Sequence, residues 1–314
     1  MKIVLQYKAS PGFRRQIADV FGADDAVIVI DEADEAAFAK EMVDADALLH
    51  VLKPVTPEVI RAAPRLKLIQ KIGVGVNTIA LDAAQAAGVA VCNMPGSNSQ
   101  AVAEMALSLM FAVLRQTLYL DALTRRGQGW RPDAARLDQV GEIGGRTVGL
   151  VGFGQSAQRL APVLSALGAR VIYTARRAHA DAPYPFAPLP ELLERSDIVS
   201  LHAPATNETR GMIDADALDR MKPGAVLINT ARGELVDEAA LFSALSAGRL
   251  RGAGLDVFAA EPTPADNPIF ALPNVVLAPH VAWLTPETLQ RSLTIALENC
   301  RRIMQGAPLF HRVV

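Results

Sequence analysis

Cysteine, histidine and aromatic residues are scarce in this sequence. Among 314 residues there are two cysteines and five histidines, and only 5% are aromatic. Cys92 and Cys300 are too few for a disulfide framework and lack the close spacing of a metal-binding pair such as CxxC. We therefore predict no metal site, and we expect a reducing cytoplasm as the compartment.

An excess of charge and a long apolar run are absent as well. The chain has 31 Lys and Arg against 33 Asp and Glu, so its net charge is −2, which argues against a nucleic acid or an anionic membrane as partner. The longest apolar stretch, 101–114, contains Glu104 and is shorter than the roughly 20 residues that cross a bilayer. We interpret it as a buried helix. The first residues contain too short an apolar run for a signal peptide.

Short β-forming runs, in contrast, alternate with helical patterns along almost the whole chain. Several runs are continuously apolar, which is typical of parallel strands that are buried on both faces. Helices between them supply the crossovers. We therefore predict an α/β fold with two doubly wound parallel sheets, Rossmann-like or flavodoxin-like. The predicted strands are 2–7, 26–30, 47–52, 67–72, 89–92, 147–152, 170–174, 197–202, 225–229, 252–257 and 274–278.

A glycine-rich turn follows the strand at 147–152. The residues "GFGQSA" (152–157) fit the pattern G-x-G-x-x-G/A between a strand and a helix. Gly152 permits the tight turn, Gly154 lets a pyrophosphate approach the backbone, and Ala157 allows close packing of helix on strand. The N-terminus of the helix then offers N–H groups to phosphate. This context favours dinucleotide binding, and a plain tight turn between strand and helix is the alternative.

The end of the next strand bears on which dinucleotide is bound. An Asp or Glu usually stands there and binds the ribose 2′-hydroxyl. This sequence instead has Thr174, Ala175, Arg176 and Arg177. Guanidinium groups suit a 2′-phosphate, so we predict NADP(H) as the preferred cofactor, with NAD(H) possible. A solvated pair of loop arginines is the alternative.

Three later strands end in polar residues that together suggest a site. Arg232 follows the strand at 225–229, Glu261 follows Asp256 in "GLDVFAAEP", and His280 stands in "NVVLAPHVAW". Ligands of open α/β sheets bind at the carboxyl ends of the strands. A cation, a carboxylate and a titratable imidazole at that edge can bind an anion and move a proton.

With these motifs the chain resembles the D-isomer-specific 2-hydroxyacid dehydrogenase family along nearly its whole length. The resemblance implies hydride transfer between a nicotinamide and C2 of a 2-oxo or 2-hydroxy acid. It also implies a substrate domain of residues 1–97 plus 282–314 and a dinucleotide-binding domain of residues 98–281, with a cleft between them. The motifs that carry it are 71–84, 93–107, 148–161, 201–213, 221–241, 254–262 and 277–288.

The resemblance assigns roles to the three polar residues. Arg232 would bind the substrate carboxylate and the 2-oxo oxygen, for which a forked guanidinium is suited. His280 would be the acid/base, and Glu261 would orient it and favour its protonated form. The backbone N–H groups of Val74 and Gly75 would also bind the carboxylate.

Further residues are expected around the cofactor and the substrate. Trp283 is a candidate wall of the substrate pocket or an ordinary packing residue. His202 is expected on the cofactor side or in a structural role, and Asp256 in a structural role or near the nicotinamide. His50 and Lys53 are additional candidates for substrate contact. The predicted cofactor-binding residues are Gly152, Phe153, Gly154, Gln155, Ser156, Thr174, Arg176, Arg177, His202, Ala203, Pro204, Thr209, Thr230, Ala231, Arg232, Asp256 and His280.

The segment "YTARR" is similar to that of NADPH-preferring glyoxylate/hydroxypyruvate reductases, so small 2-oxo acids are the expected substrates. The alternatives are phosphoglycerate, D-lactate, formate or phosphite dehydrogenase, or a non-catalytic nucleotide-sensing protein. We expect the lack of a C-terminal extension to disfavour a long regulated phosphoglycerate enzyme, and the intact Arg232, Glu261 and His280 to disfavour the sensor. The resemblance also implies a homodimer through the apolar helix near 100–118.

Overall fold

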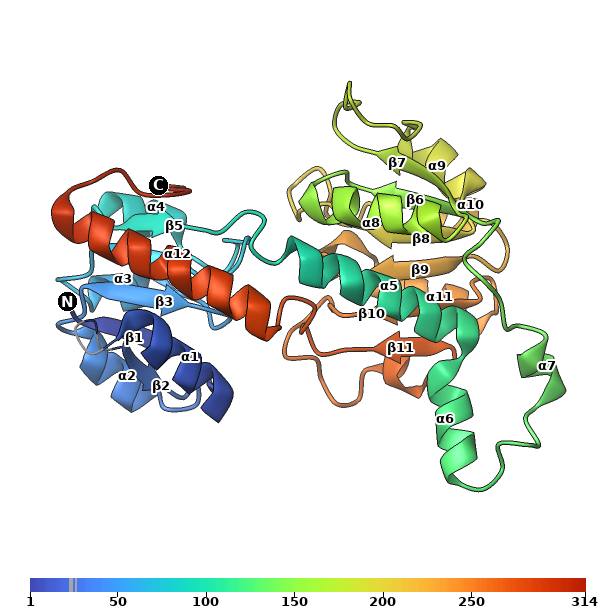
Figure 1. Cartoon of the computed structure of the whole chain (residues 1–314), viewed down its shortest axis with the longest axis horizontal. Coiled ribbons are helices and arrows are strands. Elements are labelled where there is room, and N and C mark those ends of the chain that lie inside the picture. The colour runs from blue at the N-terminus through green and yellow to red at the C-terminus, as the bar shows by residue number, and fades with distance from the viewer. Residues whose placement is uncertain (23–24, 26) are drawn as a thin grey trace. The chain divides into compact units, whose positions relative to one another are not determined.

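The structure is a computed structural model that describes residues 1–22, 25 and 27–314. It divides into two compact units, one formed by Met1–Asn98 with Trp283–Val314 and the other by Ser99–Ala282 (Figure 1). Each unit contains a parallel sheet with helices on both faces, so the predicted α/β fold is confirmed. All eleven predicted strands are present; residue 26, the first of the predicted strand 26–30, lies outside the described residues.

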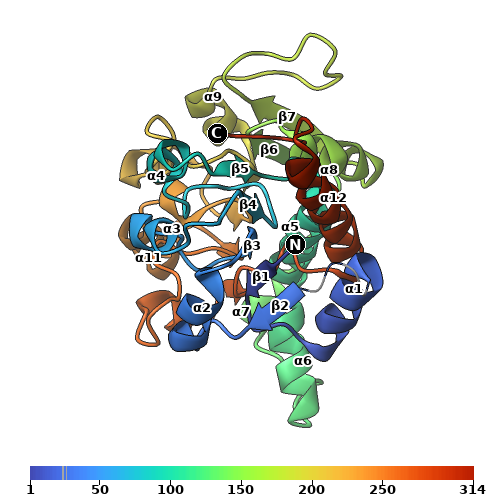
Figure 2. The same cartoon turned by 90° about the vertical axis from the view of Figure 1, so that its left-hand side faces the viewer.

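The first unit has a five-stranded sheet in the order β2-β1-β3-β4-β5, the flavodoxin-like order. Helices α1 and α12 cover one face of this sheet, and α2, α3 and α4 cover the other (Figure 2). The strands are β1 (Ile3–Gln6), β2 (Val27–Ile30), β3 (Ala47–His50), β4 (Leu68–Lys71) and β5 (Ala90–Cys92). The helices are α1 (Pro11–Phe21), α2 (Glu35–Met42), α3 (Pro57–Arg61), α4 (Leu81–Ala86) and α12 (Pro286–Gln305).

The continuous apolar character of these strands follows from burial on both faces. In β1, Ile3 and Leu5 point into the core under α1 and α12, whereas Val4 points into the core under α2 to α4. Successive side chains of a strand alternate between the two faces, so both sets must be apolar here. The pattern that predicted a parallel sheet thus has a direct structural cause.

The second unit has a six-stranded parallel sheet in the order β11-β10-β9-β8-β6-β7. A parallel bridge between Tyr173 and Phe186 adds a further position beyond β7, which the sequence did not predict. With residue 186 counted, the order follows the usual Rossmann arrangement: the chain adds strands on one side of β6 with β7 and residue 186, and then crosses to the other side of β6 with β8. The strands are β6 (Thr147–Val151), β7 (Arg170–Thr174), β8 (Ile198–Leu201), β9 (Val226–Asn229), β10 (Gly252–Leu255) and β11 (Val275–Leu277).

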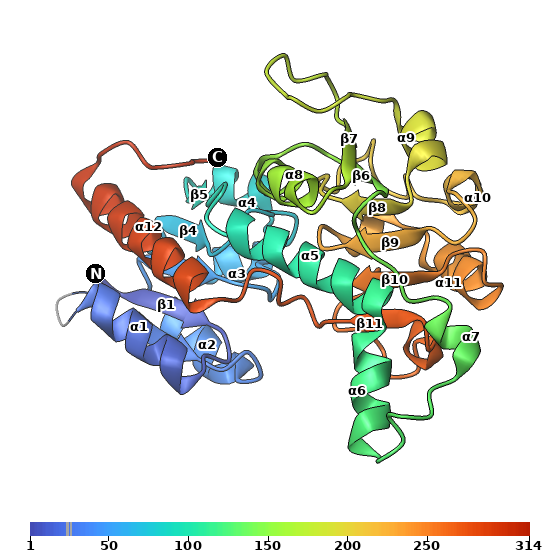
Figure 3. The same cartoon turned by 45° about the vertical axis from the view of Figure 1, so that its right-hand side comes forward.

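Helices cover both faces of the second sheet. Helices α5 and α8 share a core with one face, and α9, α10 and α11 share a core with the other. Figure 3 shows α5 running across β9, β10 and β11, which it contacts. The helices are α5 (Ser99–Arg115), α6 (Thr117–Arg125), α7 (Ala134–Leu137), α8 (Gln155–Ala166), α9 (Leu189–Arg195), α10 (Ala215–Arg220) and α11 (Glu238–Ser246), with short 3₁₀ turns η1 (Gly233–Leu235) and η2 (Pro268–Ala271).

The helix predicted near 100–118 is interrupted. Helix α5 ends at Arg115, and Gln116 adopts a left-handed backbone with φ of 49° before α6 begins. Its carboxamide donates to the Arg136 carbonyl at 2.7 Å, which fixes this corner. Within the described part of the chain no single helix is long and apolar enough to cross a bilayer; only α5 and α6 taken together, bent by 62°, reach that length and composition.

The apolar face of α5 is buried against its own sheet. Ala106, Leu109, Met110 and Leu114 are at most 3% exposed and belong to the core shared with α8 and the sheet. Burial within this unit therefore accounts for most of the apolar character that suggested a dimer interface. The homodimer itself stays a prediction.

Candidate active site

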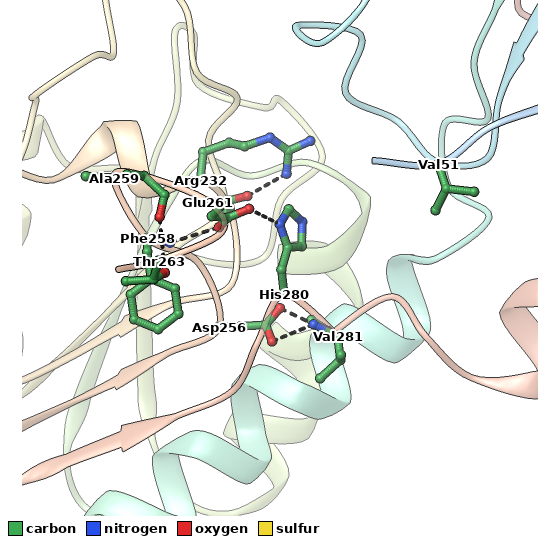
Figure 4. Close-up of polar contacts among 12 residues, drawn as sticks. Val51, Arg232, Asp256, Phe258, Ala259, Glu261, Thr263, His280 and Val281 are labelled. Carbon is green, nitrogen blue, oxygen red and sulfur yellow. Dashed lines mark hydrogen bonds and ion pairs between the residues drawn. The ribbon is translucent and has the colours of Figure 1, made fainter. Parts of the chain in front are cut away.

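Arg232, Glu261 and His280 lie at one edge of the second sheet. Arg232 follows β9, Glu261 follows β10 and His280 follows β11, and these three strands are adjacent and parallel. Parallel strands end at the same edge, so the three side chains meet despite their separation in sequence. Figure 4 shows the guanidinium, the carboxylate and the imidazole gathered together.

The Glu261 carboxylate holds the His280 ring. Nδ1 of His280 lies 2.6 Å from Oε2 of Glu261, and because a carboxylate only accepts, Nδ1 carries the proton. The other carboxylate oxygen accepts from the Phe258 N–H at 2.9 Å. Burial alone would raise the pKa of Glu261, but the hydrogen bond to His280 and the positive charges nearby keep it below its usual range. The carboxylate is therefore ionised and orients the imidazole.

Asp256 fixes the backbone that presents His280. Its side chain is fully buried, and its two oxygens accept from the N–H groups of Val281 and Ala282, each at 2.9 Å. The Asp256 carbonyl accepts from the His280 N–H at 2.7 Å. These bonds hold His280 at a φ of 54°, a conformation that non-glycine residues rarely adopt. Burial raises the pKa of Asp256 despite the two N–H donors. Its structural role is thus visible, and a contact with the cofactor stays a prediction.

The end of β9 shapes the loop that carries Arg232. The Asn229 carboxamide accepts from the Ala231 N–H at 3.0 Å and donates to the Arg232 carbonyl at 2.8 Å. Among the described residues the guanidinium donates only to the Ala231 carbonyl, at 2.6 Å. Burial lowers the pKa of Arg232, although Glu234 and Glu261 favour its charged form. A guanidinium with most of its donors available and largely removed from water is suited to bind an anion.

The glycine-rich turn has the geometry of a phosphate cradle. Gly152 has a φ of 91°, and a Cβ there would lie 2.7 Å from the backbone of His202 and Ala203, so no other residue fits. A Cβ on Gly154 would meet no atom within 4 Å, which leaves open space over the N-terminus of α8. Among the residues that the structure describes, no side chain caps that helix. Its N–H groups and this opening fit a dinucleotide pyrophosphate.

The other residues of this turn divide between core and surface. The Phe153 ring is buried and stacks on Tyr173 with 4.1 Å between ring centroids, so its side chain belongs to the core. Gln155 begins α8 and is exposed. Ser156 Oγ lies 3.2 Å from Nδ1 of His202. The backbone and the small polar side chains, rather than the aromatic ring, are the groups available to a phosphate.

His202 is a neutral, hydrogen-bonded residue beside this turn. Its Nε2 lies 2.9 Å from the hydroxyl of Ser200, and its Nδ1 contacts Ser156. Burial lowers the pKa of His202 to about 4. The geometry fits both the structural and the cofactor-side interpretation.

Two further segments line the same sheet edge. The loop after β8 is held by the Thr209 hydroxyl, which donates to the Pro204 carbonyl at 2.6 Å and accepts from the Thr206 N–H at 2.8 Å. In the loop after β9, the Thr230 hydroxyl is buried and has no hydrogen-bond partner among the described residues. A buried hydroxyl without a partner is costly unless a ligand satisfies it.

The residues predicted to read the 2′-position follow β7. Thr174 is buried at the strand end, and its carbonyl accepts from the Gly152 N–H at 2.9 Å. Arg176 and Arg177 are exposed, and within the described residues neither forms an ion pair. A phosphate that approaches them would therefore break no ion pair among the described residues.

In the first unit, Val74 and Gly75 form an exposed loop after β4, and Val74 is 40% exposed. Trp283 is 9% exposed and lies in the core under α1 and α12, with its ring 6.3 Å from that of Tyr7 between centroids. This position gives Trp283 a packing role within its unit, and a contact with substrate stays a prediction.

The two additional candidates are engaged within the same unit. His50 is 3% exposed and donates from Nε2 to the Lys53 carbonyl at 2.8 Å; burial and the charge of Lys71 lower its pKa to about 3. Lys53 forms an ion pair with Glu35 at 2.9 Å. Both therefore have structural partners.

Sequence reasoning missed several positioning residues. Gly233 lies against the backbone of Phe258, where a Cβ would be 1.9 Å from the carbonyl oxygen. Asn229 shapes the Arg232 loop, and Asn93, directly after β5, donates to the Val74 carbonyl at 2.9 Å. Asn93 and Asn229 are polar residues at strand ends, the same signal that selected Arg232. The contact of Gly233 joins two distant segments and has no local signal.

Comparison with known proteins identifies the family. The model of the D-isomer specific 2-hydroxyacid dehydrogenase NAD binding domain matches residues 107–282. D-3-phosphoglycerate dehydrogenase of Mycobacterium tuberculosis is 41% identical over 282 residues, and glyoxylate reductase of Korarchaeum cryptofilum is 38% identical over 284 residues. A crystal structure of a protein from Thermus thermophilus superposes with a TM-score of 0.91 at 36% identity, covering 100% of both chains.

The extent of these matches differs. The chain covers 85% of the glyoxylate reductase with 87% of its own length, whereas 88% of the chain spans only 52% of the phosphoglycerate dehydrogenase. The family model covers the unit that contains the glycine-rich turn, Arg232, Glu261 and His280. The chain therefore belongs to the D-isomer specific 2-hydroxyacid dehydrogenase family.

Proposed function

We propose that the chain is an NADP(H)-preferring 2-hydroxyacid dehydrogenase that reduces small 2-oxo acids such as glyoxylate and hydroxypyruvate. The observation that carries this proposal is the 2.6 Å hydrogen bond between His280 and Glu261 beside the Arg232 guanidinium. These three groups can neutralise a 2-oxo acid, orient it and supply a proton to its oxygen. The similarity to glyoxylate reductase supports the substrate class.

In this mechanism Arg232 binds the substrate carboxylate and the 2-oxo oxygen, and Val74 and Gly75 donate N–H groups to the carboxylate. A dinucleotide held by the glycine-rich turn would supply the hydride that C2 receives. His280 gives the proton from Nε2 to the 2-oxo oxygen, because Nδ1 is held by Glu261. The C=O bond becomes CH–OH, and the neutral His280 takes the proton back in the oxidative direction. Glu261 stabilises the imidazolium before transfer.

We propose that residues 98–281 bind the dinucleotide and that residues 1–97 with 282–314 bind the substrate. The open space over Gly154, the uncapped α8 and the unpartnered Thr230 hydroxyl support the first assignment. The exposed Arg176 and Arg177, with no acid at the end of β7, support NADP(H) over NAD(H).

The test is a set of initial rates with NADPH and with NADH. We expect kcat/KM for hydroxypyruvate and glyoxylate to be at least tenfold higher with NADPH, a difference of about 1.4 kcal/mol. Replacing Arg176 and Arg177 together by alanine should remove that preference while leaving the rate with NADH unchanged. Equal or better rates of the wild-type chain with NADH would refute the assignment of the two arginines.

Phosphoglycerate dehydrogenase is the second candidate, because relatives with that name are 41% identical. Including 3-phosphohydroxypyruvate and pyruvate in the same assay separates the candidates, and a higher kcat/KM for the phosphorylated acid would favour the second. A non-catalytic dinucleotide-binding protein would bind NADPH and turn over none of these acids. His280→Ala should lower turnover by orders of magnitude, whereas NADPH should still bind to the variant.

We also propose a homodimer and a cytoplasmic location. Exposed apolar side chains on and after α5 support the dimer: Phe111 is 38%, Leu118 is 57%, Trp130 is 98% and Leu137 is 43% exposed. Light scattering should give twice the mass of the chain, and Leu118→Glu with Trp130→Ser should give the monomer mass. The free, buried thiols of Cys92 and Cys300 are compatible with a reducing compartment.

A further inference from the structure

The loop at Gly73, Val74 and Gly75 has two backbone donors without an acceptor. Within the described residues, neither the Val74 N–H nor the Gly75 N–H donates a hydrogen bond. Gly73 has a φ of 141°, a backbone conformation that residues other than glycine rarely adopt. Two adjacent unpaired N–H groups are suited to an anion, provided that both point toward it.

The orientation of a backbone N–H is set by the carbonyl of the preceding residue. The peptide group is planar and trans, so its C=O and its N–H point in opposite directions. The Gly73 carbonyl therefore determines where the Val74 N–H points, and the Val74 carbonyl does the same for the Gly75 N–H. Both carbonyls are held by the segment after β5: the Met94 N–H donates to Gly73 at 2.9 Å, and Asn93 Nδ2 donates to Val74 at 2.9 Å.

This segment is itself anchored. Met94 is fully buried, and the Asn93 N–H donates to the His311 carbonyl at 3.2 Å. One of the two loop carbonyls is thus held by buried backbone, and the other by a single side chain. Without the carboxamide, the Val74–Gly75 peptide could rotate, because its second residue is glycine and the loop is exposed.

We propose that Asn93 is a positioning residue for the substrate carboxylate: by holding the Val74 carbonyl, it aims the Gly75 N–H at that carboxylate. The inference rests on the proposed function for the identity of the anion, a 2-oxo acid. Asn93 touches neither the reacting atoms nor the nicotinamide in this scheme. Its loss should therefore weaken binding of the ground state and the transition state alike.

The test begins with the kinetics of Asn93→Ala and Asn93→Leu in the full chain. We expect KM for hydroxypyruvate to rise about tenfold, with kcat within twofold and the Kd for NADPH unchanged. Asn77→Ala is the matched control, since Asn77 is an exposed asparagine of the following turn with no side-chain hydrogen bond among the described residues. It should leave KM unchanged. An unchanged KM in both Asn93 variants, or a fall in kcat with no change in KM, would overturn the proposal.

Amide NMR separates positioning from a general loss of structure. Oxamate, added to the NADPH complex, should shift the Val74 and Gly75 amide resonances of the wild-type chain. In Asn93→Ala it should still shift Val74, whose orientation depends on Met94, and no longer Gly75. Loss of both responses would indicate that the loop has lost its structure. Retention of both would show that Asn93 does not orient the Gly75 N–H. Either result overturns the proposal.

The same experiment distinguishes this inference from the proposed function. If the wild-type chain reduces no 2-oxo acid, the proposed function fails on that result alone. The ligand-free spectra then decide the role of Asn93: its replacement by alanine should shift or broaden the Gly75 amide and leave Val74 unchanged. An unchanged Gly75 amide would refute the positioning role whatever the activity.

Discussion

Replacement of Gly233 by alanine tests whether the packing of two loops sets the active-site geometry. A Cβ on Gly233 would lie 1.9 Å from the Phe258 carbonyl oxygen, 2.0 Å from its carbonyl carbon and 2.6 Å from the Ala259 nitrogen. Real Cβ atoms essentially never come within 3.0 Å of such atoms, and these are backbone atoms that cannot rotate aside. The two segments must therefore separate by about 1 Å. Overpacking of this kind costs free energy, because the backbone has to shift to make room.

That separation acts directly on the site. Gly233 follows Arg232, while the Phe258 N–H holds the carboxylate of Glu261. Moving either segment changes the position of Arg232 relative to Glu261 and His280. A misplacement of about 1 Å in an active site can lower activity by about 100-fold. We also expect a loss of about 1–3 kcal/mol in the free energy of unfolding.

The assay is kcat/KM for hydroxypyruvate with NADPH, with circular dichroism and thermal unfolding as measures of folding. Gly12→Ala is the matched control: Gly12 lies in α1, and its Cβ would have its nearest neighbours at 3.8 and 3.9 Å, an ordinary contact. This control should keep full activity and gain a few tenths of a kcal/mol or more in stability. A folded Gly233→Ala chain with activity within threefold of wild type would refute the reasoning.

Three other predictions follow from single residues. Arg232→Lys should lower kcat/KM by at least tenfold, because an ammonium cannot fork onto a carboxylate and an adjacent oxygen; near-normal kinetics would exclude bidentate binding. Gly154→Ala should leave the thermal midpoint unchanged, since its Cβ would meet nothing within 4 Å among the described residues. The same change should raise the Kd for NADPH at least tenfold in a fluorescence titration. An unaltered Kd would show that the pyrophosphate does not bind at this turn. Burial of His50 lowers its pKa to about 3 in the folded chain. Below about pH 6.5 the unfolded chain therefore binds more protons at His50 than the folded chain does. The stabilising contribution of neutral His50 is consequently lost as the pH falls toward 3. The destabilisation caused by His50→Asn, measured by urea unfolding, should therefore be smaller at pH 5 than at pH 7, and an equal or larger effect at pH 5 would contradict the assignment.

Much of this protein was readable from its sequence because the signals are local. A parallel strand buried on both faces must be apolar at successive positions, as in β1, so all strands could be found. Parallel strands all end at one edge of their sheet, so Arg232, Glu261 and His280 could be expected together before any distance was known. The glycine-rich turn was visible for a similar reason, since Gly152 has a backbone conformation that other residues avoid.

Other features depended on contacts between residues far apart in the chain. Helix α5 has an apolar face that could equally cover its own sheet or meet a second chain, and only the structure shows it buried on β9 to β11. The sequence left open whether Trp283 is a packing residue or a wall of the substrate pocket; only the structure shows that it packs beside Tyr7, at the other end of the sequence, and a contact with substrate stays a prediction. The same holds for Gly233 against Phe258 and for Asn93 on Val74. The sequence determined which chemical groups reach the edge of the sheet, whereas tertiary packing decided how they are held there, because packing depends on the joint positions of segments that no local pattern encodes.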